Sequence, residues 1–427
     1  MNKTFQSYVF GCRVNEAERI KLDKELVEAG YTVDLASPSF LVINTCAITG
    51  KAEREAKQLV YQLRKRHPEA KIVLTGCSTT LWQKYQTADT ALGDIIVPND
   101  KKSSLVSLLA EGATFKVAGS PARSAAAAAA EGASDKFRYS NRLLVKIQDG
   151  CQRFCSYCIV LYLRGLPQSQ SIRSIVTYIN SFDPLPAEVV LSAINTEAFG
   201  IDSGESFIDL IKAVLTDTRV PRLAFGSIHP WSLTNEFLEY YRTTLSKEPR
   251  FIHFFHVPIQ SGSQMMLNHM KREYVILDVI RKLNIIKKCN PHALIATDVI
   301  VGFLGETDDV FNETLKLLKA SPINRFHVFK FSNRPHTAAY YKKEQLQEPD
   351  AQEKKDRSQK LITLSKVKYD MFLTSEIGRS SSALAISHDD LRTKILLDNH
   401  SEGVIAGKQY LPGELVHVTI IAAKDGK

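Results

Sequence analysis

The sequence predicts an α/β protein in three parts: an amino-terminal open parallel α/β sheet, a central partial parallel (β/α)6 barrel, and a small carboxyl-terminal antiparallel β-barrel. Three observations lead to this fold class. The first hundred residues alternate short β-like runs with amphipathic helical patterns. Six further β-like runs, again separated by helical patterns, follow residue 142, and the last fifty residues hold short β-like runs punctuated by glycine.

Length and composition agree with this scheme. A chain of 427 residues corresponds to two or three domains of about 100 to 200 residues each, and 44% apolar with 24% charged residues is typical of a soluble globular protein. No apolar run reaches the length of a membrane span, and the start lacks the apolar core of a signal peptide, so we expect a cytoplasmic protein, with no feature that demands more than a monomer. The net charge of +9 fits a polyanionic partner such as RNA, or simply a basic surface.

The amino-terminal sheet is predicted from strands that alternate with helices over short connections. The predicted strands are "FQSYVF" (5–10), "FLVIN" (40–44), "KIVLTG" (71–76) and "DIIVP" (94–98). Helical patterns at 16–30 and 51–67 lie between them, the second stopped by Pro68. Such alternation favours a parallel sheet with helices on its faces, in a domain that spans residues 1–117.

Three cysteines follow three of these strands. Cys12, Cys46 and Cys77 each come within about two residues of a strand end. Because the carboxyl ends of parallel strands meet at one edge of a sheet, we expect these thiols to converge on a shared metal site. A single cysteine in such a place is often only a small buried hydrophobe, but three in register favour ligation. The odd total of seven cysteines argues against a disulfide framework, and Cys289 fits no motif.

The central barrel is predicted to span residues 136–365, after a low-complexity linker at 118–135 in which residues 125–130 could also extend a helix. Its six predicted strands are 142–148, 188–194, 222–228, 251–259, 293–303 and 325–331. A charged helical stretch from Pro349 to about Glu376 leads to the carboxyl-terminal domain, predicted at 366–427. Barrels of this kind carry their active site in the loops after the strands.

The loop after the first barrel strand carries three more cysteines, Cys151, Cys155 and Cys158, in the spacing C-x3-C-x2-C. Thiolates suit zinc or iron–sulfur clusters. A structural zinc site requires four protein ligands, whereas three cysteines on a 4Fe–4S cluster leave one iron open for a substrate or cofactor. The aromatic Tyr157 directly before the third cysteine favours the iron–sulfur interpretation, although a zinc-binding RNA module remains an alternative.

These motifs resemble the radical S-adenosylmethionine methylthiotransferase family over nearly the whole chain. The matching segments are "YVFGCRVNEAE" (8–18), "VINTCAIT" (42–49), "VLTGC" (73–77), "KIQDGCQRFCSYCIVLYLRG" (146–165), "HVPIQSGSQMMLNHMKREY" (256–274) and "DVIVGFLGET" (298–307). The resemblance implies a radical S-adenosylmethionine core and a small carboxyl-terminal RNA-binding domain of the TRAM type. It also implies two 4Fe–4S clusters, one on Cys12, Cys46 and Cys77 and one on Cys151, Cys155 and Cys158. The open iron of the second would bind S-adenosylmethionine.

The implied reaction converts C–H to C–S–CH3, with one S-adenosylmethionine methylating sulfur and another supplying a 5′-deoxyadenosyl radical. Within the family, the "GCRVN" form, mainly Arg13 and Val14, most resembles enzymes that act on N6-threonylcarbamoyladenosine next to the anticodon of tRNA. The resemblance therefore implies the tRNA anticodon stem-loop as a partner, together with an electron donor and a sulfur source. Sister groups act on isopentenyladenosine in tRNA or on a ribosomal protein, and a non-catalytic iron–sulfur RNA-binding protein is a further alternative.

Several side chains are candidates for contact with S-adenosylmethionine or with RNA, and no side chain is assigned as catalytic. The cofactor candidates are Tyr157, Asn195, Gln260 and Ser261. His256 and Arg164 are predicted either near the cofactor or in ordinary structural and solvated roles. Candidates for phosphate contact are Lys366, Lys368, Arg379, Arg392 and Lys394.

The chain departs from the family pattern at four positions. Leu161 and Leu304 replace prolines, and Ala193 and Glu197 replace glycines in the loop after the second barrel strand. The sequence also lacks an arginine expected near Gln170. A side chain at a glycine position could crowd the methionine end of the cofactor, so these departures bear on catalytic efficiency more than on the fold.

Overall fold

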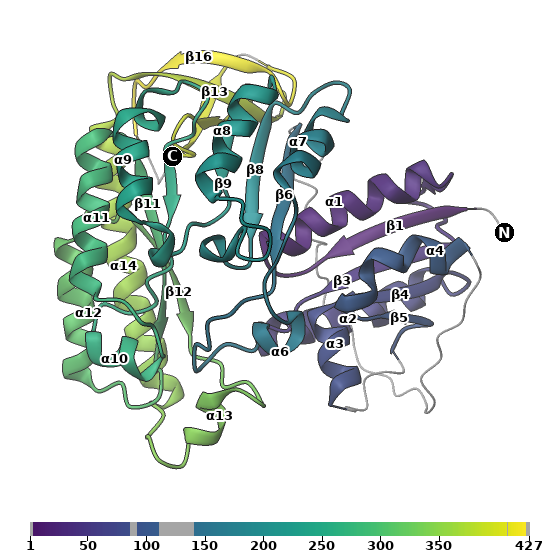
Figure 1. Ribbon diagram of the computed structural model, residues 1–427, viewed down its shortest axis with the longest axis horizontal. Coiled ribbons are helices and arrows are strands. Elements are labelled where there is room, and N and C mark those ends of the chain that lie inside the picture. Colours follow the sequence, from purple (N-terminus) through teal and green to yellow (C-terminus); the bar gives the residue numbers. More distant parts are fainter. Residues whose placement is uncertain (1–2, 86–91, 111–140, 408, 424–427) are drawn as a thin grey trace. The chain divides into compact units, whose positions relative to one another are not determined.

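The computed structural model describes residues 3–85, 92–110, 141–407 and 409–423 (Figure 1). These residues form two compact units. The first contains the amino-terminal sheet together with residues 150–152 and 158–166; the second contains residues 153–157 and the rest of the chain after residue 141. The predicted linker at 118–135 lies outside the described residues, and the predicted domain boundaries stay a prediction.

The first unit is a five-stranded parallel sheet of order β2-β1-β3-β4-β5, which confirms the predicted open parallel sheet. Its strands are β1 (Thr4–Val9), β2 (Thr32–Val33), β3 (Phe40–Thr45), β4 (Lys71–Gly76) and β5 (Ile95–Val97). Its α-helices are α1 (Arg13–Glu28), α2 (Gly50–Arg66), α3 (Cys77–Lys84), α4 (Leu105–Ala110) and α6 (Val160–Arg164).

Side-chain alternation along the strands places helices on both faces of this sheet. On one face Leu22 and Leu26 of α1 and Leu105 of α4 pack on Val42 and Val73. On the other face α2 and α3 pack on the intervening strand residues. That core consists of Leu41, Ile43, Leu59, Val60, Leu63, Ala70, Ile72, Leu74 and Trp82. The two-sided cover explains why the strands read as continuous apolar runs, as parallel strands buried on both faces do.

All six predicted strands of the second unit are present, in two sheets of order β7-β6-β8-β9 and β10-β11-β12. Apart from β7, which is antiparallel and was not predicted, neighbouring strands are parallel, and a single bridge between Leu223 and Phe251 joins the two sheets. The strands are β6 (Arg142–Asp149), β7 (Gln168–Ser169), β8 (Glu188–Ala193), β9 (Leu223–Phe225), β10 (Phe254–His256), β11 (Leu294–Val301) and β12 (Arg325–Lys330). Closure of these strands into a (β/α)6 barrel stays a prediction.

Helices connect these strands, and α14 covers the last one. Figure 1 shows α11, α12 and α14 side by side along β11 and β12, and the amide of Phe326 on β12 donates to Ser365 Oγ of α14. The α-helices are α7 (Ile172–Asn180), α8 (Phe207–Asp217), α9 (Asn235–Thr243), α10 (Gln264–His269), α11 (Ile276–Cys289), α12 (Asp308–Ala320), α13 (Ala338–Lys342) and α14 (Ala351–Ser375). The capping box of Asp350 and Glu353 fixes the start of α14, the charged helix that the sequence predicts.

The carboxyl-terminal segment forms a four-stranded antiparallel sheet of order β15-β14-β13-β16. Its strands are β13 (Ser380–His388), β14 (Arg392–Leu397), β15 (Glu402–Ala406) and β16 (Leu415–Thr419). The predicted antiparallel strands are confirmed, while closure into a TRAM-like barrel stays a prediction. This sheet is attached to the second unit by buried polar contacts: Arg222 donates to Leu397 O at 2.8 Å, and His253 N–H donates to Asp398 O at 2.9 Å.

Three histidines inside the second unit make its stability depend on pH. Burial is the main cause that lowers the pKa of His229 to about 3 and the pKa values of His253 and His400 to about 4. The same rings have pKa values of about 6.5 in the unfolded chain. Since the folded-state values are depressed, the stabilisation is complete above pH 6.5 and is lost as the pH falls toward 4.

We therefore expect the free energy of unfolding to fall by about 4 kcal/mol between pH 7.5 and pH 5.5, roughly 1.3 kcal/mol for each histidine. Urea unfolding followed by circular dichroism at a series of pH values measures this. The variant His253→Phe keeps the ring packing and removes one titrating group, so its slope should be smaller by about a third. An unchanged slope in that variant would contradict the assignment.

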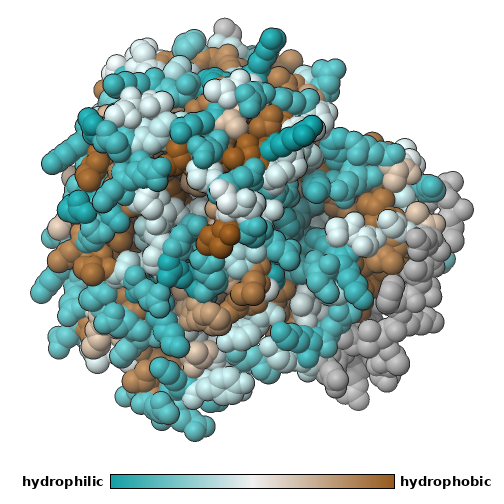
Figure 2. Space-filling model, viewed as in Figure 1, coloured by the Kyte–Doolittle hydropathy of each residue, from teal (hydrophilic) through white to brown (hydrophobic). Residues whose placement is uncertain are grey.

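The surface carries hydrophobic residues in separate patches. On the face shown in Figure 2 these patches are interspersed with hydrophilic residues rather than joined into one apolar surface. Among the described residues, no helix combines the length and the apolar character that crossing a membrane requires.

Candidate active site

Cys12, Cys46 and Cys77 lie at the carboxyl ends of β1, β3 and β4, as predicted. Cys12 caps α1, Cys46 directly follows β3, and Cys77 is the first residue of α3. The three thiols are near enough that negative charge on Cys77 raises the pKa of both Cys12 and Cys46. The structure thus brings together the first predicted set of ligands.

Two glycines permit this approach. Gly11 has φ +97°, and a Cβ added to it would lie 2.4 Å from the sulfur of Cys46. Gly76 has φ +101°, and its added Cβ would lie 2.3 Å from the carbonyl oxygen of Thr45. Any side chain at either position would push the strand ends apart, so the two Gly-Cys pairs are requirements of the site geometry.

The surroundings of Cys12 and Cys46 disfavour ionisation of these two thiols in the protein alone. Burial raises the pKa of Cys46 to about 12 and also raises that of Cys12. A ligand set of this kind needs a metal centre or a nearby cation to hold thiolates. Two of the sulfurs also lie at helix starts, since Cys12 caps α1 and Cys77 opens α3, where free backbone N–H groups favour negative charge.

The cation at this site is Arg164, which comes from the same unit. Its side chain is 1% exposed, and its Nε donates to Cys77 Sγ at 3.3 Å. The same guanidinium donates to Glu18 Oε1 at 2.9 Å and to Asn15 Oδ1 at 2.5 Å. Lys102 also reaches Glu18, at 2.5 Å, so that two cations share one buried carboxylate beside the sulfur.

Apolar side chains complete the surroundings of Cys77. Ile159 and Leu163, from the segment after the second set of cysteines, pack with Cys77, Ala47 and Leu81. Asn99 Nδ2 approaches Cys77 Sγ at 3.6 Å. The site therefore excludes much of the water around this sulfur while leaving polar donors in contact with it.

The three thiols are the kind of ligand that an iron–sulfur cluster takes. Each of three thiolates binds a separate iron of a 4Fe–4S cluster, and the fourth iron stays open. The residues present thus fit the cluster that the sequence suggests.

The second set of cysteines is distributed over the two units. Cys151 and Cys158 belong to the first unit, and Cys155 belongs to the second. In the first unit, Cys151 N–H donates to Gly165 O at 3.0 Å. In the second unit, the buried Arg272 donates to Cys155 Sγ at 3.7 Å, and its guanidinium stacks over the ring of Trp231. Each set of cysteines therefore includes one sulfur in contact with a buried arginine.

The predicted cofactor residues occupy well-defined places in the second unit. The Tyr157 ring lies edge-on to Phe303, with centroids 6.4 Å apart. Asn195 follows β8 and accepts from Glu197 N–H, while its own N–H donates to the side chain of Gln148. Gln260 adopts φ +67° and donates its N–H to Asp298 O.

Ser261 is buried and its hydroxyl pairs with Thr314 at 3.2 Å, an internal contact. The roles of these residues in cofactor binding stay predictions.

The departures from the family pattern are absorbed locally. Glu197 forms an ion pair with Arg153, whose guanidinium also stacks over Trp231 at 4.5 Å. Leu304 is 1% exposed in an apolar cluster with Met266 and Phe303. Ala193 ends β8, and Leu161 lies on α6. Glu197 thus has an ion-pair partner and Leu304 a place in the apolar core.

Two predicted phosphate contacts are replaced by internal ones. Lys368 donates its Nζ to the carbonyl oxygens of Leu318, Lys319 and Ser321, and burial lowers its pKa to about 8. Arg379 forms a bidentate pair with Asp398 at 2.8 Å. Both side chains hold elements of the second unit together, so the prediction that they contact RNA is wrong for them.

The sequence predictions missed several residues of these sites. Glu18 and Arg272 lie in quoted motif segments but were given no role there, and Lys102 lies outside them all. Asn15 and Glu18 share a face of α1 one turn after Cys12, which was the available signal. Asp298 and His327 were also missed, although both lie on predicted strands.

Two family models and a solved structure match this chain. Residues 145–318 match the model of the Radical SAM superfamily, and residues 4–97 match a family described as "Uncharacterized protein family UPF0004". The radical S-adenosylmethionine methyltransferase TsrM from Kitasatospora setae has a similar fold, with a TM-score of 0.54 at 12% identity over 79% of this chain and 77% of that one.

Relatives in sequence identify the family of the chain within the Radical SAM superfamily. The threonylcarbamoyladenosine tRNA methylthiotransferase MtaB of Thermotoga maritima is 31% identical over 79% of this chain and 76% of its own length. The MtaB protein of Aquifex aeolicus is 30% identical over 92% and 95%. A tRNA-2-methylthio-N(6)-dimethylallyladenosine synthase of Lachnoclostridium phytofermentans is 27% identical over 99% and 93%. The chain belongs to the radical S-adenosylmethionine methylthiotransferase family, which implies a 4Fe–4S cluster and S-adenosylmethionine.

Proposed function

We propose that this protein is a tRNA methylthiotransferase that converts N6-threonylcarbamoyladenosine next to the anticodon to its 2-methylthio derivative. The observation that carries the proposal is Arg164. It lies six residues after the last cysteine of the C-x3-C-x2-C motif, and it contacts Cys77 of the other set. The loop of one cysteine set thus builds part of the other site, as expected for an enzyme that uses both in one reaction. Three relatives that are 30% to 32% identical to this chain are named threonylcarbamoyladenosine tRNA methylthiotransferases.

Two 4Fe–4S clusters are part of the proposal. Cys12, Cys46 and Cys77 would hold the auxiliary cluster, and Cys151, Cys155 and Cys158 would hold the cluster that binds S-adenosylmethionine. When bound, these groups supply hydrogen abstraction and sulfur for C–S bond formation. In balance, the reaction would consume two S-adenosylmethionine molecules, one converted to S-adenosylhomocysteine and one to 5′-deoxyadenosine and methionine, and external donors would supply electrons and sulfur.

The chain's own residues bind, orient and shield these groups. Arg164 and Arg272 place a positive charge beside one thiolate of each set, which favours the ionised ligand. Ile159 and Leu163 keep water from Cys77. Tyr157, Asn195, Gln260 and Ser261 would position S-adenosylmethionine.

The proposal includes RNA binding by a monomer in the cytoplasm. The net charge of +9 supports contact with an anticodon stem-loop. Arg392 and Lys394 are exposed basic side chains on β14, and Arg392 also pairs with Asp389 at 2.9 Å. We place the domain limits of this arrangement at residues 117, 136 and 365.

The test uses cells that lack the gene, complemented with the wild type or with a variant. Wild-type protein should restore 2-methylthio-N6-threonylcarbamoyladenosine in tRNA digests analysed by mass spectrometry. The variant with Cys12, Cys46 and Cys77 changed to alanine should leave the unmethylthiolated nucleoside. The purified variant should hold about four irons where the wild type holds about eight. Unchanged nucleosides in the deletion cells would refute the tRNA substrate, and equal iron contents would refute the auxiliary cluster.

A further inference from the structure

A group of three metal-ligating side chains that includes no cysteine lies on the second sheet of the second unit. His256 ends β10, Asp298 lies in β11 and His327 lies in β12. Asp298 is paired directly with His327 across the two parallel strands. His256 is paired with Ala296, two residues before Asp298, so all three side chains project from one face of the sheet.

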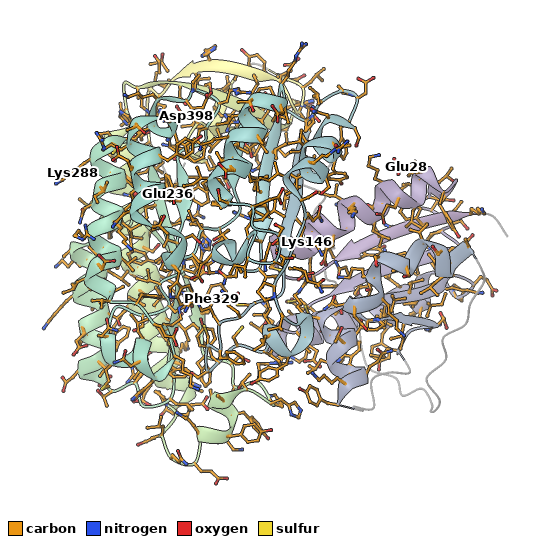
Figure 3. All side chains as sticks on the ribbon, in the orientation of Figure 1. Glu28, Lys146, Glu236, Lys288, Phe329 and Asp398 are labelled. Atoms are coloured by element: carbon orange, nitrogen blue, oxygen red, sulfur yellow. The ribbon has the colours of Figure 1, made fainter. Side chains whose placement is uncertain are left out.

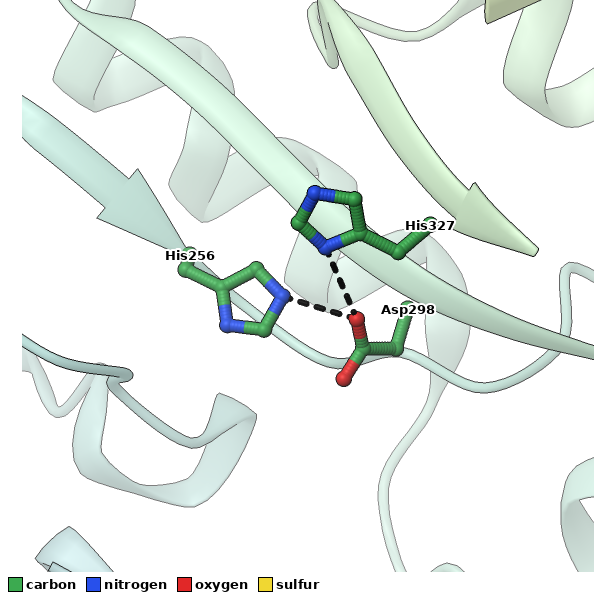
Figure 4. Close-up of side chains that lie close together, drawn as sticks. All are labelled: His256, Asp298 and His327. Atoms are coloured by element: carbon green, nitrogen blue, oxygen red, sulfur yellow. Dashed lines mark hydrogen bonds and ion pairs between the residues drawn. The ribbon is translucent and has the colours of Figure 1, made fainter. Parts of the chain in front are cut away.

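The donor atoms of the three side chains converge on one point (Figure 4). His256 Nε2 lies 2.8 Å from Asp298 Oδ1, and His327 Nδ1 lies 3.3 Å from the same oxygen. All three ligand atoms lie within 4.8 Å of one another. Ligands bonded to one divalent ion at zinc-type distances stand about 3.0 to 3.5 Å apart, so small side-chain rotations would seat an ion between them.

The surroundings of the group support ligation. The second ring nitrogen of His256 pairs with Ser227 Oγ at 3.1 Å, the kind of outer contact that fixes the orientation of a metal-binding imidazole. One carboxylate oxygen, Asp298 Oδ1, accepts from both imidazoles, so the three side chains already share one meeting point. The side chains are 14%, 22% and 42% exposed for His256, Asp298 and His327, so an ion can enter.

An aromatic surface continues the same face of β12. Phe329 lies two residues after His327, and it is 46% exposed (Figure 3). An exposed ring is a platform on which a nucleobase stacks. A base on Phe329 would direct a substituent along the strand toward His327 and Asp298. The N6 substituent of the proposed substrate ends in a carboxylate, which the negative charge of Asp298 would repel unless a cation lay between them.

We propose that His256, Asp298 and His327 bind a divalent transition-metal ion of the zinc type, whose open positions take the carboxylate of the threonylcarbamoyl group. The metal site stands on the geometry of the three side chains alone. The assignment of the carboxylate rests on the proposed function. A hydrophobic isopentenyl substituent would have no ligand for such an ion, so the site would favour the threonylcarbamoyl substrate.

Zinc binding tests the proposed metal site. Full-length protein with both clusters reconstituted is freed of loosely bound metal with a chelator, dialysed against Zn²⁺, and analysed for zinc, iron and sulfide. Wild type should hold one more equivalent of zinc than Asp298→Asn, at equal iron and sulfide. His327→Gln, changed at a half-exposed position that tolerates it, should lose the same equivalent. His388→Gln, an exposed histidine at the end of β13, should match wild type.

Equal zinc contents in wild type, Asp298→Asn and His327→Gln would overturn the metal site.

Binding of anticodon stem-loops with and without the threonylcarbamoyl group tests the assignment of the carboxylate to this site. Zinc-loaded wild type should prefer the modified stem-loop by at least about tenfold, and Asp298→Asn should show no preference. If zinc binding depends on Asp298 and His327 but the protein shows no such preference between stem-loops, only the carboxylate assignment is overturned. If zinc binding depends on Asp298 and His327 but the tRNA nucleosides of the deletion cells are unchanged, the proposed function is refuted and the metal site is supported.

Discussion

Replacing Arg164 by methionine is expected to lower the free energy of unfolding by about 3 kcal/mol and to deplete the cluster on the amino-terminal cysteines. Methionine keeps the volume of the side chain and removes its charge. The buried Glu18 would keep Lys102 as its partner, which limits the loss of stability. Cys77 would lose the cation that favours its thiolate. Urea unfolding and iron content of the purified variant measure both effects.

Two further variants separate the loss of stability from the loss of the cluster. Glu18→Gln and Lys102→Met combined with Arg164→Met remove all three charges of this group, and this triple variant should recover part of the stability but not the iron. Arg64→Met breaks an ion pair with Asp94 whose partners are about 40% exposed, so it should cost less than about 1 kcal/mol. The reduction potential of any cluster that Arg164→Met retains should fall, on the order of 100 mV, because a nearby positive charge is absent. An unchanged iron content and potential would show that Arg164 has only a structural role.

Replacing Glu188 by glutamine is expected to lower the free energy of unfolding by about 3 to 5 kcal/mol. Glu188 on β8 is fully buried and accepts from Arg142 at 2.6 Å, from Arg222 at 3.0 Å and from His400 at 3.0 Å. Burial would raise the pKa of this carboxyl, but the charges of Arg142 and Arg222 and the hydrogen bond from His400 hold it well below the usual range. Glutamine would leave Arg222, 2% exposed, without a buried counter-charge.

The matched control for this change is Arg142→Gln. Arg142 is partly exposed, and its loss leaves Glu188 with two partners, so the cost should be roughly half as large. Thermal and urea unfolding of the three proteins at pH 7.5 give the comparison. A cost below about 1 kcal/mol for Glu188→Gln would show that the two arginines find other compensation.

The sequence was sufficient to predict those features that follow from strand geometry. The convergence of Cys12, Cys46 and Cys77 required only that three parallel strands end at one edge, and the structure places them so. The four antiparallel carboxyl-terminal strands and the charged helix before them followed from local patterns in the same way. The two-residue strands β2 and β7 were not predicted, because so short a pairing leaves no periodicity to detect.

Long-range charge pairing could not be predicted. Glu18 and Arg164 are 146 residues apart, and Glu188 and His400 are 212 residues apart. Glu18 and Arg164 lie in two of the quoted motif segments, but neither segment indicates that the two side chains meet. Glu188 and His400 belong to no motif, and a charged residue is usually solvated. Lys368 illustrates the opposite error: its position in a basic helix suggested RNA, whereas its ammonium group binds carbonyl oxygens at the end of α12.

The composition of the first unit has a consequence for protein synthesis. Ile159, Leu163 and Arg164 belong to this unit although they follow the linker and the first strand of the second unit. A ribosome therefore completes the surroundings of Cys77 only after residue 166 has left the exit tunnel, when β6 of the next unit has already been made. A fragment that stops at residue 117 would lack these side chains and would expose Cys77 to oxidation. Biochemical work on the amino-terminal site thus requires the longer chain, and the natural order of assembly delays the site until the second set of cysteines is present.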